Sequence, residues 1–492
     1  MLFNSYAFLF AFFPFTLCGY YLLRRLERVR TAQVFLLAAS WFFYAWWDPR
    51  YLGLIVAWTF ADYVIAARIL SARARGEGSR GWLVGGLAFN LGLLGYFKYF
   101  GFLVRNINGV FHAGLAVPAI VLPLAISFHT FQQIAYLVDA HRGEVQGRPP
   151  LLDYALFVCF FPQLIAGPIV HHTEFFPQLA KRGYPDSLAV RLSTGLTVLA
   201  IGLVKKVIFA DAMAGYATPL FDAADAGVGP CALEAWGGSI AYAFQIYFDF
   251  SGYSDMAIGL AACFGFAFPF NFASPYKSRS ITEFWRRWHM TLSRFLRDYL
   301  YISLGGNRKG ATRRHVNLMI TMLLGGLWHG AGWTFVVWGA LHGGYLVVNH
   351  RFRDVARARG WELERTFVGR AACTMVTMLA VVVAWVFFRS KTVSGALVLL
   401  RAMAGAGGAP TEGLDRFFIP WLIGCGLVVW VLPNTQEWMG LRAPNAPSET
   451  PSSEVRMPAW RPSTLWGVAV GALVVLGVMG LGHPTVFIYF HF

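Results

Sequence analysis

The sequence has few charged residues for its length. Asp, Glu, Lys and Arg make up only 13% of the 492 residues, whereas 57% are hydrophobic and the mean hydropathy is +0.51. This composition cannot cover a water-facing surface, so it excludes an ordinary soluble domain. The net charge of +16 does not indicate a nucleic-acid partner, because the basic residues cluster in short segments beside apolar runs and no base-reading motif is present.

Metal and nucleophile signatures are also missing from the sequence. The six cysteines are scattered without a CxxC pair, and neither an HExxH motif nor a Ser-His-Asp or Cys-His signature is present. His171, His172 and Glu174 have HHxE spacing, but adjacent side chains on a helix point about 100° apart. The sequence therefore predicts no metal site and no permanently bound cofactor.

Long apolar runs separated by short basic segments predict an all-α, polytopic membrane protein. A span needs about 20 apolar residues, and the chain has room for about ten to thirteen helices, some short enough to be re-entrant. Residues 1–492 are expected to form a single transmembrane domain, with its motifs at about 115–390 and additional C-terminal helices at about 415–485. The candidate spans are Leu2–Leu23, Gln33–Trp47, Tyr51–Leu70, Trp82–Leu103, Leu115–Val138, Tyr154–Val170, Leu192–Ala210, Ala232–Phe250, Met256–Phe270, Leu318–Val348 (one or two helices), Ala371–Phe388, Phe417–Leu432 and Leu465–Leu481.

His329 lies in an apolar stretch that is almost free of ionisable groups. Between Asn317 and Asn349 there is no Asp, Glu, Lys or Arg, and only His329, His342 and Tyr345 can ionise. A group that titrates near neutral pH is costly in hydrocarbon, so such residues usually face a protein interior or a cavity where they act in chemistry or transport. The flanking glycines weaken a regular helix. This stretch alone supports a packing role and a functional role equally.

The stretch Ser278–Gly306 predicts an amphipathic helix with His289 in its middle. Arg286 and Arg287 lie off its apolar stripe, which favours a helix anchored by charge at the membrane interface. The alternative is that the arginines bind phosphates, as in an acyl-CoA, while His289 lines the opening of a reaction chamber. The stripe itself consists of Phe284, Trp288, Thr291, Phe295 and Tyr299.

Two further apolar stretches contain unusual residues: one has helix-breaking prolines and the other has carboxylates. Phe160–Pro177 contains three prolines and a glycine, so it cannot form one continuous helix and is expected to be buried in protein or to line a cavity. In Gln245–Asn271, Asp249 and Asp255 are functional candidates because carboxylates are expensive in a membrane. The sequence SGYSD, which ends at Asp255, is also typical of a turn followed by an N-cap, which slightly favours a structural role.

Taken together, these stretches resemble the membrane-bound O-acyltransferase (MBOAT) family, in particular its alginate-acetylating branch, with the D-alanylating branch as a near relative. The resemblance implies a ring of tilted helices around a funnel-shaped centre. It also implies that the histidine of WHG, His329, is catalytic and that the histidine of WRRWH, His289, is a second essential residue. The motifs that carry it are FPQLIAGPI at Phe161–Ile169, YFDFSGYSDMAIGLA at Tyr247–Ala261, the segment Phe270–Arg308, and LLGGLWHGAGWTFVVWGALHG at Leu323–Gly343.

The resemblance further implies acyl transfer across a bacterial inner membrane, from acetyl-CoA toward an exopolysaccharide such as alginate. Because acetyl-CoA is an activated thioester, the reaction needs a base and a group that stabilises the oxyanion. His329 is the expected base, and His289 is expected to position a substrate or to protonate the thiolate. The expected partners are a periplasmic or membrane-anchored, AlgJ- or AlgX-like O-acetyltransferase, the exopolysaccharide machinery and the lipid bilayer. Weaker candidates for binding donor or substrate are Arg286, Arg287, Trp328, Asp249 and Asp255.

Three alternative functions remain open at this point. The chain could move D-alanyl or another acyl group to a cell-envelope polymer, as DltB does. It could be a transporter or flippase that uses His329 as a proton relay, although the sequence has no inverted repeat and no chain of intramembrane carboxylates. It could also be a structural subunit of a secretion complex.

Overall fold

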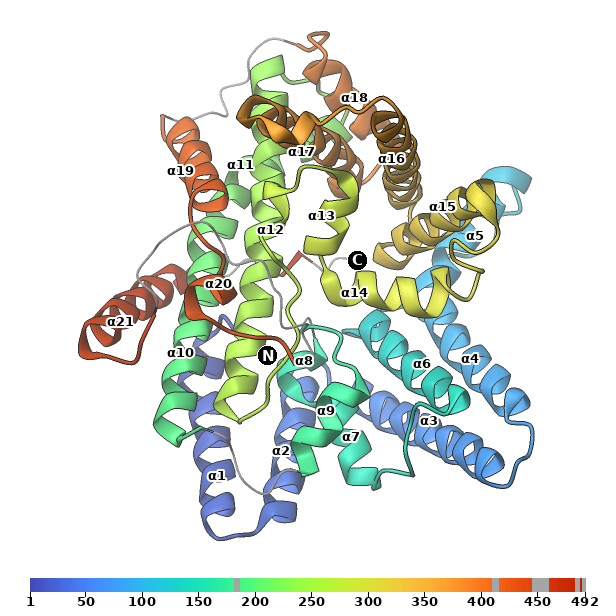
Figure 1. Ribbon diagram of the computed structural model, residues 1–492, viewed down its shortest axis with the longest axis vertical. Coiled ribbons are helices and arrows are strands. Elements are labelled where there is room, and N and C mark those ends of the chain that lie inside the picture. The colour runs from blue at the N-terminus through green and yellow to red at the C-terminus, as the bar shows by residue number, and fades with distance from the viewer. Residues whose placement is uncertain (166, 181–185, 409–415, 445–459, 483–486, 489–492) are drawn as a thin grey trace.

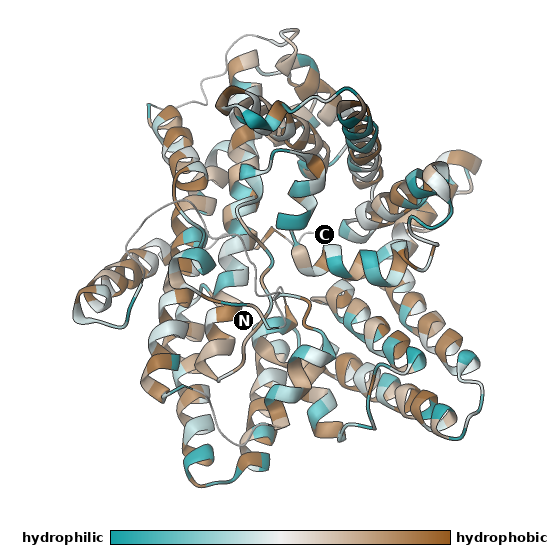
Figure 2. Ribbon diagram, in the orientation of Figure 1, coloured by the Kyte–Doolittle hydropathy of each residue, from teal (hydrophilic) through white to brown (hydrophobic). Residues whose placement is uncertain are grey.

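The computed structural model describes the chain except for residues 166, 181–185, 409–415, 445–459, 483–486 and 489–492. The described residues form helices and connecting segments and include no strand (Figure 1). Hydrophobic residues run along the outer helices, and hydrophilic ones gather in the connections (Figure 2). The prediction of an all-α, polytopic membrane protein is confirmed. Within the part of the chain that the structure describes, five segments are long and apolar enough to span a membrane: Ala7–Arg25, Arg50–Ala74, Arg80–Phe111, Phe367–Arg389 and Thr464–Gly482.

The N-terminal part consists of helices that pack against their neighbours in the chain. Most follow the predicted spans, but the span expected at Leu115–Val138 becomes helical only at Ile126, because Pro118 and Pro123 interrupt the preceding segment. The elements are η1 (Ala7–Phe12), α1 (Phe13–Arg25), α2 (Val29–Ala45), α3 (Arg50–Ala74), α4 (Arg80–Leu94), η2 (Gly95–Tyr99), α5 (Phe100–Phe111) and α6 (Ile126–Arg142).

The predicted break in Phe160–Pro177 is confirmed. The helix α7 (Leu151–Cys159) ends just before this segment, which then contains the short helix α8 (Phe161–Leu164) and the start of α9 (His172–Ala180). Phe161, Ile169 and Val170 are buried. The irregular backbone is therefore enclosed by protein, as a membrane protein requires.

A single long helix, α12 (Ala232–Cys263), runs through the middle of the molecule (Figure 1). The sequence predicts two spans here with a turn at SGYSD, and that prediction is wrong because the helix continues without interruption for 32 residues. The helices α10 (Leu188–Val204) and α11 (Asp211–Asp225), with η3 (Lys205–Ala210) between them, pack along it.

Glycines allow α10 and α12 to cross with their backbones almost in contact. A Cβ atom at Gly252 would lie 2.7 Å from the carbonyl oxygen of Gly202, and one at Gly259 would lie 2.6 Å from that of Gly195. Small residues at a helix crossing are a standard means of association in membranes. Gly252 belongs to the SGYSD sequence. It lies inside a helix and not in a turn, and its missing side chain allows α10 to pack closely against α12.

The C-terminal half brings several short elements against α12 and ends in more peripheral helices. The predicted span Leu318–Val348 is divided into two helices at His329. In the region 415–485, where additional C-terminal transmembrane helices are predicted, the chain forms the short apolar helix α19 (Phe418–Trp430) and the longer α21 (Thr464–Met479). Residues 445–459 between them lie outside the described part. The elements are η4 (Pro275–Lys277), α13 (Ile281–Arg287), α14 (Met290–Phe295), η5 (Leu296–Tyr301), α15 (Gly310–His329), α16 (Trp333–Ala358), η6 (Leu363–Arg365), α17 (Phe367–Arg389), α18 (Val393–Met403), α19 (Phe418–Trp430), α20 (Thr435–Met439), α21 (Thr464–Met479) and η7 (Gly480–Gly482).

Candidate active site

His329 is the last residue of α15. The helix ends there because Gly330 adopts an extended conformation, and no larger residue fits at that position: a Cβ atom would lie 2.1 Å from the ring of Phe335. The imidazole is only 3% exposed. Its ring centroid lies 5.1 Å from those of Trp338 and Phe388. The WHG motif thus places a histidine at an abrupt helix end within an aromatic wall.

His289 lies at a second helix break. The sequence predicts one continuous amphipathic helix through this histidine, and that prediction is wrong: α13 ends at Arg287 and α14 begins at Met290. His289 itself has a φ of 43°, in the left-handed region that non-glycine residues rarely adopt. Strain of this kind persists only where the surroundings enforce it, and it concentrates at functional sites.

Asn271 holds the break in place from a distant part of the chain. Its backbone oxygen accepts from the Met290 N–H at 2.9 Å, and its Oδ1 accepts from the Thr291 hydroxyl at 2.7 Å. Its amide nitrogen donates to Ser254 Oγ on α12 at 3.0 Å. The hydrogen bonds that distort the chain at His289 therefore come from tertiary structure.

The two breaks bring His289 and His329 together. Their ring centroids are 6.5 Å apart, and the His289 side chain is completely buried, with its ring 4.7 Å from that of Phe250. A small reacting group between the imidazoles could contact both, which is the arrangement that general acid–base chemistry requires. The structure therefore joins the two predicted catalytic residues, which are 40 positions apart in the sequence.

Trp328 forms a wall of this site. Its ring lies 4.9 Å from His329, 6.1 Å from His289 and 5.1 Å from Phe131. Its indole N–H points to the backbone oxygen of Ser127 at 3.4 Å. Trp328 is only 3% exposed, so it packs in the protein interior beside both histidines.

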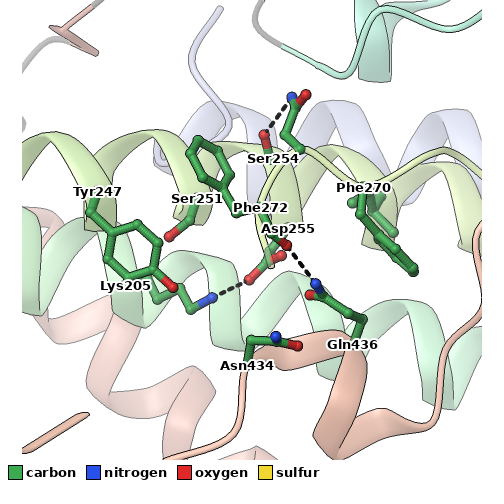
Figure 3. A pocket seen from close by; sticks show the side chains of 11 residues that line it. Lys205, Tyr247, Ser251, Ser254, Asp255, Phe270, Phe272, Asn434 and Gln436 are labelled. Carbon is green, nitrogen blue, oxygen red and sulfur yellow. Dashed lines mark hydrogen bonds and ion pairs between the residues drawn. The ribbon is translucent and has the colours of Figure 1, made fainter. Parts of the chain in front are cut away.

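Asp249 and Asp255 form ion pairs between α12 and η3. Asp249 lies 2.7 Å from the Lys206 ammonium and accepts from the backbone N–H of Ile488, and Asp255 lies 2.6 Å from the Lys205 ammonium (Figure 3). These contacts tie α12 to η3. Asp255 also lines a small polar pocket, whose further lining residues include Tyr247, Ser251, Ser254, Asn271, Asn434 and Gln436 (Figure 3).

Comparison with known proteins places the chain in a family. The pattern of the membrane-bound O-acyltransferase family matches residues 142–385, which include both histidines. A peptidoglycan O-acetyltransferase of Helicobacter pylori is 42% identical over 441 residues, covering 85% of this chain and 82% of that protein. The chain belongs to the membrane-bound O-acyltransferase family. It is therefore a multi-pass membrane protein and an acyltransferase.

Two other relatives of this acyltransferase differ in their sequence identity to it and in how much of its length they match. A probable alginate O-acetylase AlgI of Azotobacter vinelandii is 43% identical over 421 residues, covering 85% of this chain and 80% of that protein. A teichoic acid D-alanyltransferase of Streptococcus thermophilus is 30% identical over 236 residues, covering 46% and 56% respectively. Similarity to the relatives named for O-acetylation thus extends over much more of the acyltransferase.

The two arginines expected to bind donor phosphates have different surroundings. Arg287 pairs with Glu283 at 2.8 Å and donates to the backbone oxygen of Ala273 at 3.1 Å, so it braces α13. Arg286 is exposed on the same helix. Arg286 is therefore the more solvent-exposed of the two arginines and the more accessible to a ligand.

Arg294 is expected to contribute more to stability than its neighbour Arg297. It pairs with both carboxylate oxygens of Glu174, at 2.6 and 3.0 Å, and the Glu174 side chain is only 2% exposed. Arg294→Ala leaves a buried carboxylate unpaired and should lower the free energy of unfolding by about 3 kcal/mol. Arg297→Ala, which removes the exposed pair with Asp298, should cost less than about 1 kcal/mol. Thermal unfolding of both variants in detergent tests this prediction, and equal shifts would contradict it.

Among the described residues, Asp139, His171 and His172 have donor atoms close enough to hold a metal ion, within 4.8 Å of one another. The sequence suggested a different trio, His171, His172 and Glu174, and spoke against it on the assumption that both histidines lie within one helix. That assumption is wrong, because α9 begins only at His172. In the structure, His171 Nε2 and the Tyr299 hydroxyl hydrogen-bond Asp139 Oδ2 at 2.6 and 2.7 Å, and Arg142 lies 4.0 Å from Asp139 Oδ1. Burial and the neighbouring His171 lower the pKa of His172 to about 4. These hydrogen bonds connect α6, the start of α9 and η5.

Two residues that shape this site, Asn271 and Lys98, were not predicted from the sequence. Asn271 carries no signal in the sequence, because its role depends on contacts made only in the fold. Lys98 did carry one: it is a lone cation in the apolar run Trp82–Leu103, and intramembrane charges are functional candidates by default.

Proposed function

We propose that this O-acyltransferase takes an acetyl group from cytoplasmic acetyl-CoA and passes it across the bacterial inner membrane for O-acetylation of an exported polysaccharide such as alginate. The observation that carries the proposal is the buried pair His289 and His329, set at two helix breaks inside an aromatic wall. The relatives named for O-acetylation support acetyl over D-alanyl as the transferred group, because their similarity extends over much more of the chain.

In the proposed reaction, His329 acts as the general base. Its imidazole takes the proton of an acceptor hydroxyl, whose oxygen attacks the thioester carbonyl to give a tetrahedral oxyanion. Collapse of this intermediate breaks the carbon–sulfur bond and leaves the acetyl group on the acceptor oxygen. The proton then passes to the departing CoA thiolate, from His329 directly or through His289. Each turnover thus moves one acetyl group and one proton and needs no further reactant.

The surrounding aromatic residues support this role by limiting access of water. Trp328, Trp338 and Phe388 pack around His329. Excluding water suppresses hydrolysis of the thioester and strengthens the electrostatic interactions within the site. A periplasmic or membrane-anchored O-acetyltransferase of the AlgJ or AlgX type is the proposed partner that receives the acetyl group and completes transfer to the polymer.

Peptidoglycan is the second candidate for the final acceptor. The observation in its favour is the Helicobacter pylori relative, which is similar over four fifths of its own length and whose name specifies peptidoglycan. The membrane step would be the same for both polymers. The two candidates are distinguished by which polymer loses O-acetyl groups when the gene is deleted.

A vesicle experiment tests the membrane step. Sealed inside-out vesicles that contain the acyltransferase, with the periplasmic partner and polymer in the lumen, receive acetyl-CoA labelled with ¹⁴C in the acetyl group and ³H in the CoA moiety. We expect ¹⁴C to reach the luminal polymer while ³H stays outside. Entry of both labels together would indicate a transporter, and labelling only from a D-alanyl thioester would indicate the alternative acyl group.

A further inference from the structure

Lys98 lies inside the helical segment Arg80–Phe111, one of the five that are long and apolar enough to span a membrane. It belongs to η2, a short π-helical turn between α4 and α5. Turns of this kind are frequent at functional sites, and a charge within a span is expensive unless a partner stabilises it. The location of this lysine therefore requires a physical explanation.

The Lys98 ammonium binds the end of the helix that carries His329. It donates to the backbone oxygens of Trp328 at 2.5 Å and His329 at 3.2 Å, and to Ser127 Oγ at 3.1 Å. An ammonium group has three N–H donors, and these three acceptors account for them. The neighbouring Tyr99 hydroxyl donates to the backbone oxygen of Leu327 at 2.8 Å.

This end of α15 needs support from outside the helix. The last carbonyl groups of any helix lack intrahelical partners and carry partial negative charge. Here the helix stops abruptly, and its closing hydrogen bond, from the Gly330 N–H to the Gly326 oxygen, is long at 3.4 Å. The contacts from Lys98 and Tyr99 thus fix three consecutive carbonyl groups, those of residues 327 to 329, just where the proposed base lies.

We propose that Lys98 is a positioning residue for His329: by capping the last turn of α15, it holds the imidazole at the distance from His289 that transfer requires. This inference rests on the proposed role of His329 as the base. Lys98 acts through the backbone of that histidine. A displacement of about 1 Å in a catalytic group can cost about 100-fold in rate.

The kinetic test compares Lys98→Met, which keeps the length but removes the donors, with Lys98→Arg, which keeps the charge. We expect Lys98→Met to lower kcat by about 100-fold with little change in KM, and Lys98→Arg to recover at least about tenfold of that loss. In a Lys98→Met/His329→Ala double variant, the second change should add little, because residues that act as a unit are not additive. Lys309→Met, an exposed lysine next to the other end of α15, is the matched control and should keep wild-type kcat.

A chemical readout separates the positioning role from the proposed function. Diethyl pyrocarbonate modifies accessible imidazoles, and mass spectrometry resolves the modification rate of each histidine. Lys98→Met should raise the rate at His329 severalfold and leave His342 unchanged, whether or not His329 is the base. An unchanged rate at His329, or a kcat loss that only follows the amount of folded protein, would overturn the positioning role. Full activity of the His329→Ala single variant would instead overturn the proposed function, while the modification rates would still report on Lys98.

Discussion

Replacing His329 with alanine is expected to lower kcat for acetyl transfer by about 10³-fold, within the range that a general base contributes. The substitution removes the imidazole that is proposed to take the proton of the attacking hydroxyl. The change should leave the fold intact, because the aromatic wall of Trp328, Trp338 and Phe388 remains. The measurement is O-acetyl content of the polymer, or ¹⁴C transfer in vesicles, normalised to the amount of folded protein.

His342→Ala is the matched control for this experiment. His342 is also fully buried and contacts the same Trp338, at 4.7 Å between ring centroids. However, its Nδ1 accepts from the indole N–H of Trp285 at 3.2 Å, which gives it a packing role. Both variants remove a buried imidazole, so their losses of stability should be similar, whereas only His329→Ala should abolish transfer. Equal losses of kcat in the two variants would contradict the assignment of His329 as the base.

The sequence predicted features that depend on local composition. Apolar length located most spans, and glycines and prolines located the breaks in Phe160–Pro177 and beside His329. An ionisable residue in an apolar run is visible without the fold, which is why the residues alone made His329 a candidate. Its catalytic role was predicted only from the resemblance to the family.

The sequence could not predict features that distant contacts impose. The apolar stripe around His289 continues at helical spacing, so nothing local reveals that Asn271 divides the helix there. Conversely, SGYSD has the composition of a turn, yet it remains helical because Gly252 packs on the backbone of α10. In both places tertiary packing overrides the local preference. The cluster of Asp139, His171 and His172 could not be predicted either, because the directions of the two histidine side chains depend on where α9 begins.

The crossing of α10 and α12 should be the part of the fold most sensitive to mutation. Gly252→Ala would place a methyl group 2.7 Å from the Gly202 oxygen and 3.1 Å from the Lys206 nitrogen. Both are backbone atoms, so no change of rotamer can relieve the clash and the helices must move apart. That movement would stretch the buried Lys206–Asp249 pair, which measures 2.7 Å. We expect a loss of at least about 3 kcal/mol, comparable to breaking a buried ion pair, and little correctly folded protein in the membrane.

Gly215→Ala in α11 provides a control with the opposite expected sign. A Cβ atom at Gly215 would meet nothing within 4 Å, and alanine is favoured over glycine in a helix by about 1 kcal/mol. The same substitution should therefore raise the thermal unfolding midpoint at Gly215 and lower it sharply at Gly252. Size-exclusion profiles and unfolding midpoints of the two variants in detergent measure the difference. Similar midpoints would mean that α10 and α12 can separate at little cost, and the ion pairs from Lys205 and Lys206 would then have to hold this crossing together.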